Sequence, residues 1–451
     1  MKIQIRLPEA VQYILHTLEE AGFEAYAVGG CIRDVIMGRE PNDWDITTSA
    51  NPVEVKRLFR KTIDTGIKHG TVTIMIKRTG YEVTTYRVDG EYRDGRHPEN
   101  VLFTSSLEED LERRDFTVNA MAYNEKRGLV DLFGGVQDIS AKCIRCVGPA
   151  EQRFTEDALR MMRAIRFSAQ FGYEIEESTR TAICRLAPNL QKISAERIQA
   201  ELVKLITSPH PEMLRTAYET GITGMILPEF DLCMKTPQNN PHHCYSVGEH
   251  IIQSMKEIRP DRILRLTMLF HDIGKPSMKS TDDNGVDHFR NHAQTGAETA
   301  RKIMQRLKFD NETIRRVCRF VQYHDWQIHA EESSIRKVIS KIGEDAFPEM
   351  FEVNEADISA QNPGCKEEKL IKLNRLKEAY TLIRKNGDCL SLKTLQVSGE
   401  DLIRCGIVQG TEIGSILKNM LSDVLEQPEH NHKEYLLNHL GSYRGSIRGR
   451  D

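Results

Sequence analysis

The chain has 451 residues, of which 39% are hydrophobic and 28% charged, and this length predicts several soluble domains rather than one core. No apolar run approaches the roughly 20 residues of a membrane span, and the start MKIQIRLPEA lacks the apolar core of a signal peptide. We therefore expect a cytoplasmic protein with no membrane partner. The net charge of −4 excludes a uniformly basic surface, so any RNA contact must come from local patches.

The ten cysteines are scattered without the spacing of a disulfide framework, which predicts free thiols in a cytosolic chain. Cys143 and Cys146 form a lone C-x-x-C pair. A structural zinc site takes four ligands, and the sequence has no second pair of this kind. We therefore expect these two cysteines to be ordinary strand residues.

The first predicted elements are a helix and a strand. Residues 7–21 carry apolar side chains at helical spacing and end at Gly22, a typical helix stop. The apolar run 25–28 then predicts a strand, and it is followed by Gly29 and Gly30. Glycine lets backbone N–H groups approach a phosphate at a helix start, where the peptide dipoles also favour negative charge. This turn is a candidate phosphate site.

Two carboxylates follow the glycine turn at alternate positions, Asp43 and Asp45. On a strand, side chains two apart project from the same face, so we expect both carboxylates to point into one space. Two oxygen ligands, completed by water and phosphate, suit Mg²⁺. Further on, residues 52–59 predict a helix, and residues 71–77 and 81–87 predict strands joined by a turn at 78–80.

The joint pattern GG(x)₁₂DWD, followed by Tyr81-Glu82-Val83, resembles the nucleotidyltransferase superfamily with its polymerase-β-like palm. The fuller stretch GGCIRDVIMGREPNDWDIT is similar to the class II branch, which contains tRNA CCA-adding enzymes and bacterial poly(A) polymerases. The resemblance implies that Asp43 and Asp45 are catalytic and bind Mg²⁺, and that Gly30 and Arg33 touch the incoming nucleotide. Glu82 fits the third carboxylate of the superfamily, with an exposed strand glutamate as the alternative.

Residues 113–123, RRDFTVNAMAY, follow an acidic helix predicted at 107–112 and resemble the second motif of the family. The resemblance implies that Arg114 contacts the nucleotide and that Asp115 reads the ribose hydroxyl. A carboxylate that accepts a hydrogen bond from a sugar hydroxyl is physically reasonable. The polar stretch 88–103 predicts a mobile loop. CCA-adding enzymes have a flexible loop at this position that helps to switch from C to A addition, so its presence favours full CCA addition.

A helix predicted at 155–171 places Glu156, Arg160 and Arg163 within one arc, with Asp157 and Arg166 flanking it. Surface i,i+4 pairing would explain this pattern without a function. However, EDxxRxxRxxRF resembles the family motif in which an aspartate and an arginine hydrogen-bond the edge of the incoming base. The resemblance implies this role for Asp157 and Arg160, and it places Arg163 and Arg166 among the nucleotide-binding residues.

Potential metal ligands are concentrated after residue 241. An adjacent His-Asp pair follows the apolar run LTMLF, and further histidines lie on both sides of it, which packing alone does not explain. The set resembles the HD phosphohydrolase superfamily. The resemblance implies one divalent metal at His250, His271, Asp272 and Asp357, and a second at His292 with His324. Mixed imidazole and carboxylate ligands predict a transition metal such as Ni²⁺, Mn²⁺, Fe²⁺ or Zn²⁺.

The resemblance thus implies an α+β nucleotidyltransferase head with a polymerase-β-like palm at residues 1–148, followed by all-α regions. These are a neck at 149–235, an HD domain at 236–360 and a tRNA-binding tail at 361–451. In the tail, residues 367–385 predict an amphipathic helix, residues 397–440 predict short helices, and the basic end SYRGSIRGR could contact phosphates.

The resemblance implies template-independent addition of C, C and A to tRNA from CTP and ATP, with release of pyrophosphate. One alternative is a poly(A) polymerase, although residues 66–71 look like the CCA-adding version. The other is a metal-dependent phosphohydrolase whose head docks RNA. The oligomeric state stays open at this point.

Overall fold

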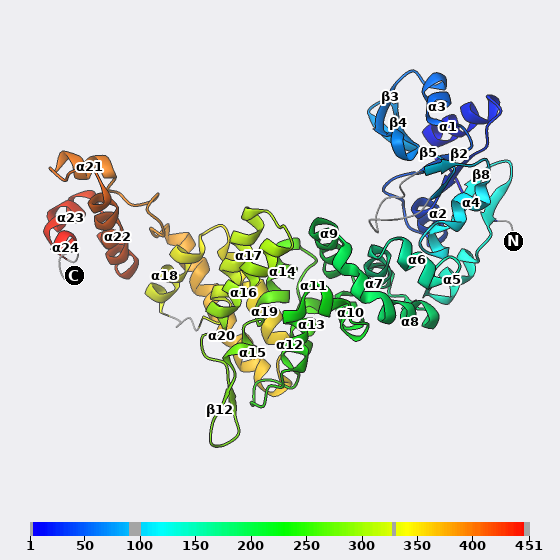
Figure 1. Ribbon diagram of the computed structural model, residues 1–451. Helices are drawn as coiled ribbons and strands as arrows, with labels where there is room; N and C mark the ends of the chain where they lie inside the picture. The colour runs from blue at the N-terminus through cyan, green and yellow to red at the C-terminus, as the bar shows by residue number, and fades with distance from the viewer. Residues whose placement is uncertain (1–2, 90–100, 327–330, 446–451) are drawn as a thin grey trace. The chain divides into compact units, whose positions relative to one another are not determined.

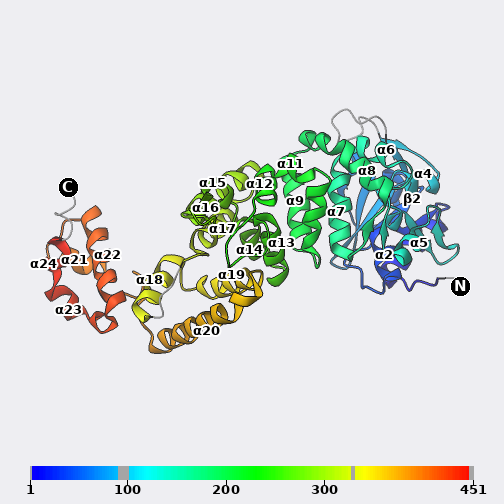
Figure 2. The same ribbon diagram turned by 90° about the horizontal axis from the view of Figure 1, so that it is seen from below.

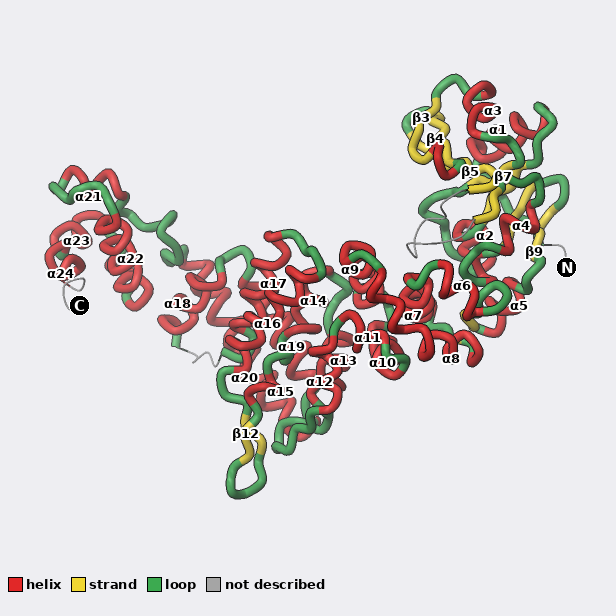
Figure 3. The backbone as a smooth tube through the Cα atoms, in the orientation of Figure 1, coloured by secondary structure: helices red, strands yellow, loops and turns green. Residues whose placement is uncertain are grey.

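The computed structural model describes residues 3–89, 101–326 and 331–445, and it divides the chain into two compact units (Figure 1). Unit 1 comprises Met1–Asp231 with Arg306–Lys308, and unit 2 comprises Leu232–Gln305 with Phe309–Asp451. The described part of unit 2 is helical apart from a short hairpin, β12 (Ser280–Thr281) and β13 (Asp287–His288) (Figure 3). The predicted fold class, an α+β head followed by helical regions, is confirmed.

Unit 1 is built on a seven-stranded mixed sheet with the order β3-β4-β5-β2-β1-β8-β9. Neighbouring strands pair antiparallel, except that β2 and β5 run parallel. The strands are β1 (Ala25–Val28), β2 (Ile46–Thr48), β3 (Thr62–Gly66), β4 (Thr71–Ile76), β5 (Thr79–Thr85), β8 (Met121–Asn124) and β9 (Gly128–Asp131). The candidate active-site segments therefore flank the central strands β1 and β2.

Helix α1 (Glu9–Glu20) packs against β1 through the apolar side that its spacing predicted. Val11, Ile14, Leu15 and Leu18 are each at most 2% exposed. Gly22 follows the helix with a φ of 89°, a left-handed conformation that favours glycine. Its N–H donates to the carbonyl of Glu19, which ends the helix and turns the chain into β1.

Several predicted boundaries in the head are wrong by a few residues. The turn between β4 and β5 is made by Lys77, which has a φ of 57°, and β5 already starts at Thr79. β3 is a strand that we did not expect, because its sequence TIDTG is polar and its residues are largely exposed. The ends of the predicted loop 88–103 form β6 (Arg87–Asp89) and β7 (Val101–Phe103), while residues 90–100 lie outside the described residues.

Helical elements cover and extend this sheet. The predicted acidic helix is α4 (Leu107–Glu112), and the 3₁₀ turn η2 (Thr117–Asn119) follows it. After the sheet comes α5 (Gly135–Ala141), which packs against α2 (Gly30–Ile36). A helical array follows, in which α7 packs on α9 and α6 on α8 (Figure 2). The array comprises α6 (Ala150–Glu156), α7 (Leu159–Phe171), α8 (Glu177–Leu186), α9 (Ala195–Ile206), α10 (Leu214–Glu219), α11 (Ile222–Ile226) and α12 (Pro228–Lys235).

The helices of unit 2 hold the predicted HD residues and the tail. They are α13 (Val247–Glu257), α14 (Arg262–Phe270), α15 (Lys275–Met278), α16 (His292–Arg306), α17 (Asn311–Tyr323), α18 (Glu332–Ile342), α19 (Phe347–Ser359), α20 (Pro363–Asn386), α21 (Gly399–Arg404), α22 (Thr411–Glu426), α23 (Lys433–Asn438) and α24 (Leu440–Gly445). The predicted helix 367–385 lies within α20, whereas α22 has 16 residues and is longer than expected. Most of the basic end lies outside the described residues.

Candidate active site

The glycine turn after β1 lines the candidate site of the head. Gly29 has a φ of 81°, and its N–H donates to the carbonyl of Met121 at 3.0 Å. The Gly29 N–H is thus used within the sheet, and the phosphate contact expected of the glycine turn stays a prediction that rests on Gly30. A Cβ at Gly29 would lie 2.8 Å from Nη1 of Arg114. The glycine thus leaves room for the arginine, and Gly30 begins α2 (Gly30–Ile36) beside it.

The two motif aspartates precede β2 rather than lie within it, which corrects the predicted strand. The carbonyl of Asp45 still accepts a hydrogen bond from the N–H of Val28 at 2.9 Å, so the segment follows β1 up to the strand. Asp43 and Asp45 each keep part of their surface exposed, and Asp45 also lines a cavity of the head. Ile46 pairs with Val83 in the parallel register of β2 and β5, which brings Glu82 one strand away.

Two other carboxylates, Asp43 and Glu82, lie close enough to Asp45 to affect its ionisation. Desolvation, together with the nearby charge of Asp43 and then of Glu82, raises the pKa of Asp45 to about 6, and Arg114 opposes this shift. A carboxylate whose pKa is raised by nearby carboxylates is stabilised by a cation beside it. The oxygen donors of Asp43 and Asp45 therefore fit a Mg²⁺ ion.

A cavity beside these carboxylates collects side chains from the glycine turn, from η2 and from α7. Eight of its residues were predicted: Gly29, Gly30, Arg33, Asp45, Arg114, Asp115, Arg163 and Arg166. Its other lining residues are Asn119, Phe167 and Gln170. Four arginines and few carboxylates around one hollow favour an anionic ligand.

The cavity arginines are held by specific partners. Arg33 is buried, donates to Asp34 and lies 4.7 Å above the ring of Phe171. Arg166 donates to Glu201 at 2.6 Å and lies 3.8 Å above the ring of Phe167. Because these contacts fix the guanidinium groups before any ligand binds, the cavity is preorganised.

A second hollow adjoins the first and shares Arg114, Asp115 and Arg163 with it. Its other lining residues are Arg113, Asp157, Leu159, Arg160 and Arg197. The structure thus brings the proposed base-reading residues, Asp157 and Arg160, next to the cavity. Arg160 donates to Glu156 at 2.6 Å and to the carbonyl of Arg113 at 2.9 Å, so its base-reading role stays a prediction.

The predicted helix 155–171 is broken at Asp157. α6 ends at Glu156, α7 begins at Leu159, and the carboxylate of Asp157 accepts a hydrogen bond from the N–H of Leu159 at 3.0 Å. Its other oxygen accepts from Nη2 of Arg197 at 2.7 Å. Arg197 is not among the predicted site residues, and this contact gives it a place in the site.

The six predicted HD residues meet in the interior of unit 2. His250 Nε2 lies 2.8 Å from Asp357 Oδ1, and His292 Nε2 lies 3.3 Å from His324 Nε2. Two triplets have ligand atoms within 4.8 Å of one another and share Asp272, namely His250, His271, Asp272 and Asp272, His292, His324. The sequence therefore identified residues that the fold brings together.

The orientation of the histidine rings fits metal binding. In each of the four histidines, Nδ1 lies 2.7–3.3 Å from a backbone carbonyl oxygen. Because a carbonyl only accepts, Nδ1 carries the proton and Nε2 faces the carboxylates. Metal-binding histidines commonly donate their other ring N–H to a carbonyl in the way that Nδ1–H does here. Three of these carbonyls belong to the residue three positions earlier in the chain, and only the carbonyl of Ala360, which contacts His250, comes from a distant residue.

The charge balance of the cluster also calls for a cation. Burial alone would lower the pKa of His271, but Asp272 and Asp357 raise it to about 10. Against the effect of burial, Lys275 and then His271 hold the pKa of Asp272 well below its usual range, and His250 with His271 does the same for Asp357. Among the described residues, Nε2 of His271 is buried without a hydrogen-bond partner. A divalent cation would satisfy this atom and both carboxylates.

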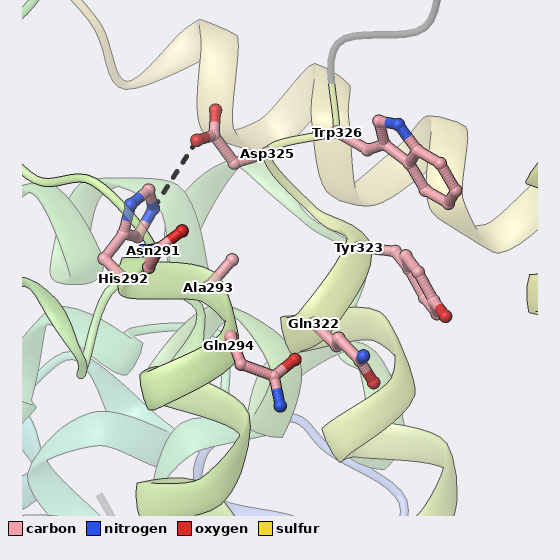
Figure 4. Close-up of a pocket in the computed structure, with 8 residues that line it drawn as sticks. All are labelled: Asn291, His292, Ala293, Gln294, Gln322, Tyr323, Asp325 and Trp326. Atoms are coloured by element: carbon pink, nitrogen blue, oxygen red, sulfur yellow. Dashed lines mark ion pairs between the residues drawn. The ribbon is translucent and has the colours of Figure 1, made fainter. Parts of the chain in front are cut away.

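One face of this cluster opens into a pocket between the start of α16 and the end of α17 (Figure 4). His292 points into it and lies 3.9 Å from Asp325, while the rings of Tyr323 and Trp326 stack at 5.1 Å on its other side. We did not predict these three residues, although Asp325 directly follows His324. The pocket reaches the cluster at His292, which is the one cluster histidine in its lining.

Two further expectations concern the cysteines and membranes. All ten cysteines are free, and Cys143 lies in the short strand β10 (Cys143–Ile144). Within residues 3–89, 101–326 and 331–445, the helices are too short or too polar to cross a membrane.

Comparison with known proteins gives three family-model matches. A "Poly A polymerase head domain" matches residues 25–145. A "Probable RNA and SrmB- binding site of polymerase A" matches residues 172–234, and a "tRNA nucleotidyltransferase domain 2" matches residues 288–440. Together these matches reach from the head into the tail.

Individual relatives bear the name CCA-adding enzyme. The protein of Leuconostoc mesenteroides is 56% identical over 195 residues, which are 43% of this chain and about half (49%) of that relative. The protein of Levilactobacillus brevis is 34% identical over 429 residues, which are 95% of this chain and 96% of that relative. A crystal structure of the Bacillus stearothermophilus CCA-adding enzyme in complex with CTP matches with a TM-score of 0.71 and 27% identity, covering 99% of this chain and 100% of that one. The chain therefore belongs to the family of CCA-adding enzymes.

Proposed function

We propose that the chain adds C, C and A to the 3′ end of tRNA, taking the nucleotides from CTP and ATP and releasing pyrophosphate. The observation that carries this proposal is the head cavity, where the Asp45 carboxylate, the arginines and Asp115 line one hollow. The tRNA 3′-hydroxyl would attack the α-phosphate in line, with pyrophosphate as the leaving group. A full CCA product, rather than poly(A), accords with the family of its relatives.

Each residue has a role in this proposal. Asp43 and Asp45 would hold Mg²⁺, which neutralises charge on the phosphates, and Glu82 supports this site from the next strand. Arg33 and Arg114 would hold the triphosphate next to Gly30, and Asp115 would accept the ribose hydroxyl. Asp157 and Arg160 would read the base edge, a carboxylate accepting from the amino group and a guanidinium donating to a ring acceptor. Arg163 and Arg166 orient these groups.

The test is incorporation of CTP alone, ATP alone and both into tRNA that lacks its CCA end. We expect CTP alone to add two residues and both nucleotides to add three. Asp43→Asn and Asp45→Asn should each lower the rate roughly 10³-fold, the scale of losing a preorganised charge-stabilising group, because their carboxylates hold the metal. Asp64→Asn, which changes an exposed carboxylate paired with Lys56, is the control. Poly(A) from ATP alone would contradict the proposal.

The buried cluster of unit 2 supports a second activity, a metal-dependent phosphohydrolase. His250, His271, Asp272 and Asp357 would hold one transition-metal ion, and His292 with His324 would help to hold a second. Such an ion polarises a phosphoryl oxygen and lowers the pKa of water. The observation that favours this activity is the open pocket at His292, since a purely structural metal site needs no access (Figure 4).

A further inference from the structure

Asp110 is a buried carboxylate that has no role in the proposed reaction. It lies on α4, and its side chain is 0% exposed. Its Oδ1 accepts from Nε and Nη2 of Arg113, at 3.0 and 2.7 Å, and its Oδ2 accepts from Nη2 of Arg114 at 3.3 Å. Burial by itself would raise the pKa of this carboxyl, but Arg113 and Arg114 outweigh burial and lower it. Asp110 is therefore an anion that anchors two neighbouring arginines.

The same carboxylate contacts the strand that follows the motif aspartates. Its Oδ2 lies 3.2 Å from Oγ1 of Thr47, a fully buried residue of β2. Thr47 comes two positions after Asp45 in the chain. Asp110 thus connects α4 to the start of β2, and it fixes the side chain of Arg114 relative to Asp45.

Arg114 extends from this anchor into the head cavity, where Asp45 also lies. A Cβ at Gly29 would meet Nη1 of Arg114 at 2.8 Å, so the guanidinium lies against the glycine turn. Burial and the charge of Asp43 raise the pKa of Asp45, and the charge of Arg114 opposes them. In the described part of the chain, Asp110 is the one carboxylate that forms an ion pair with Arg114. The arginine therefore acts on Asp45 while it is held by Asp110.

We infer that Asp110 is a positioning residue that holds Arg114 back from Asp45 and so keeps the Asp45 carboxylate available for Mg²⁺. This inference rests on the proposed function, because it assumes that Asp45 holds the metal. The cavity is lined by two carboxylates, and one of them, Asp115, already accepts from Arg163. A guanidinium released from Asp110 would therefore pair with Asp45, and this pair would occupy the oxygens that the metal needs.

Metal binding measures this role without turnover. The probe is Tb³⁺, a luminescent hard cation that takes oxygen ligands as Mg²⁺ does. Trp44 lies between Asp43 and Asp45, and the chain has one other tryptophan, Trp326. In a Trp326→Phe background, Tb³⁺ luminescence excited through Trp44 reports metal in the head, and Asp45→Asn should abolish it.

Asp110→Asn keeps the shape of the side chain and removes its charge. We expect this variant to bind Tb³⁺ about tenfold or more weakly, because an opposite charge a few ångströms away lowers the affinity of a carboxylate for a cation by at least this factor. The Mg²⁺ concentration for half-maximal CTP incorporation should rise in parallel, with a smaller change in kcat at saturating Mg²⁺. Asp110→Glu keeps the charge and should weaken Tb³⁺ binding less than Asp110→Asn. Unchanged Tb³⁺ affinity in Asp110→Asn would overturn the inference.

A double variant separates this role from a structural one. Arg114→Gln removes the competing cation, so it should bind Tb³⁺ at least as tightly as wild type, although its CTP incorporation should fall. In Asp110→Asn/Arg114→Gln, the affinity for Tb³⁺ should return to within about threefold of Arg114→Gln, because the two side chains act through one interaction. If the double variant binds Tb³⁺ as weakly as Asp110→Asn, the loss is structural and the inference is overturned.

The matched control is Glu109→Gln. Glu109 is the exposed neighbour of Asp110 on α4, and it accepts from the hydroxyl of Thr104. The substitution removes the same charge one residue away, and it should keep the wild-type Tb³⁺ affinity and Mg²⁺ dependence. A loss as large as that of Asp110→Asn would overturn the inference. Failure of the wild type to incorporate CTP would instead contradict the proposed function, and the Tb³⁺ affinities would still decide the role of Asp110.

Discussion

Asp115 is ionised in the folded protein although it is only 8% exposed. Burial by itself would raise the pKa of this carboxyl, but Arg163 and Asn119 outweigh burial and lower the pKa to about 2. An unfolded aspartate has a pKa of about 3.9. Because the folded state binds this proton more weakly, the carboxylate stabilises the fold above about pH 4, and this contribution is lost as the pH falls through 2.

Asp115→Asn should therefore change how stability depends on pH. We expect the variant to be less stable than wild type by about 2 kcal/mol near pH 6, and the difference to shrink as the pH falls from 4 toward 2. Urea denaturation at several pH values measures it, and Asp64→Asn serves as the exposed control with a small, constant difference. A gap for Asp115→Asn that stays constant down to pH 2.5 would contradict the coupling to Arg163.

At the scale of elements, the spacing of apolar residues was sufficient to predict helices and strands that bury an apolar side. α1 and β1 were predicted closely, because their apolar spacing depends only on neighbouring residues. The break before α7 was missed, since it depends on Arg197 bonding Asp157 from 40 residues away. The polar edge strand β3 has no apolar period and was missed for that reason.

In the candidate sites, too, some residues could be predicted from the sequence and others only from the fold. The HD residues could be predicted because packing alone does not account for histidine and aspartate at that density. Asn119 could not, since a single asparagine within RRDFTVNA carries no signal until the fold brings Arg33 and Asp115 to its two ends. Tyr323 and Trp326 likewise become informative only when the end of α17 is placed beside α16.

Arg336 shows how one side chain ties elements together in unit 2. It lies on α18, is 5% exposed, and donates to the carbonyls of Leu425 and Glu426 at the end of α22. It also pairs at 3.0 Å with Asp388, whose side chain is 8% exposed. The arginine thus satisfies the last carbonyls of one helix and a buried carboxylate at the same time.

Arg336→Met should destabilise the packing of α22. It leaves a buried carboxylate without its cation, a change that costs about 3–5 kcal/mol. Hydrogen exchange of the full-length protein is the measurement, and we expect faster exchange across α22. Lys337→Met is the matched control, because Lys337 is the next residue and its pair with Glu426 is exposed, so it should cost less than about 1 kcal/mol. Equal exchange in α22 of Arg336→Met and wild type would rule out this role.

At the scale of the whole molecule, each compact unit holds one candidate site. The cavity with Asp45, Arg33 and Asp115 lies in unit 1, whereas the cluster around Asp272 lies in unit 2. The donor sets also differ, with carboxylates alone in the head and imidazole with carboxylate in the cluster. Mg²⁺ suits the first set and a transition metal the second. Two units with different donors predict separable activities.

His271→Ala tests this independence. The imidazole of His271 is fully buried and its Nε2 faces Asp272 and Asp357, so its loss should remove bound transition metal and any phosphatase or phosphodiesterase activity. CTP incorporation into tRNA should stay within about threefold of wild type, since the proposed head residues belong to unit 1, the cluster belongs to unit 2 and the metal requirement differs. His288→Ala, at a half-exposed histidine of β13, is the control that should keep its metal. Asp45→Asn is the reciprocal variant, and we expect it to lose CTP incorporation and to retain the transition metal.

Elemental analysis and both activity assays on each purified variant test the independence of the two sites. Unchanged metal content in His271→Ala would refute it. Joint loss of both activities in the folded protein would refute it as well.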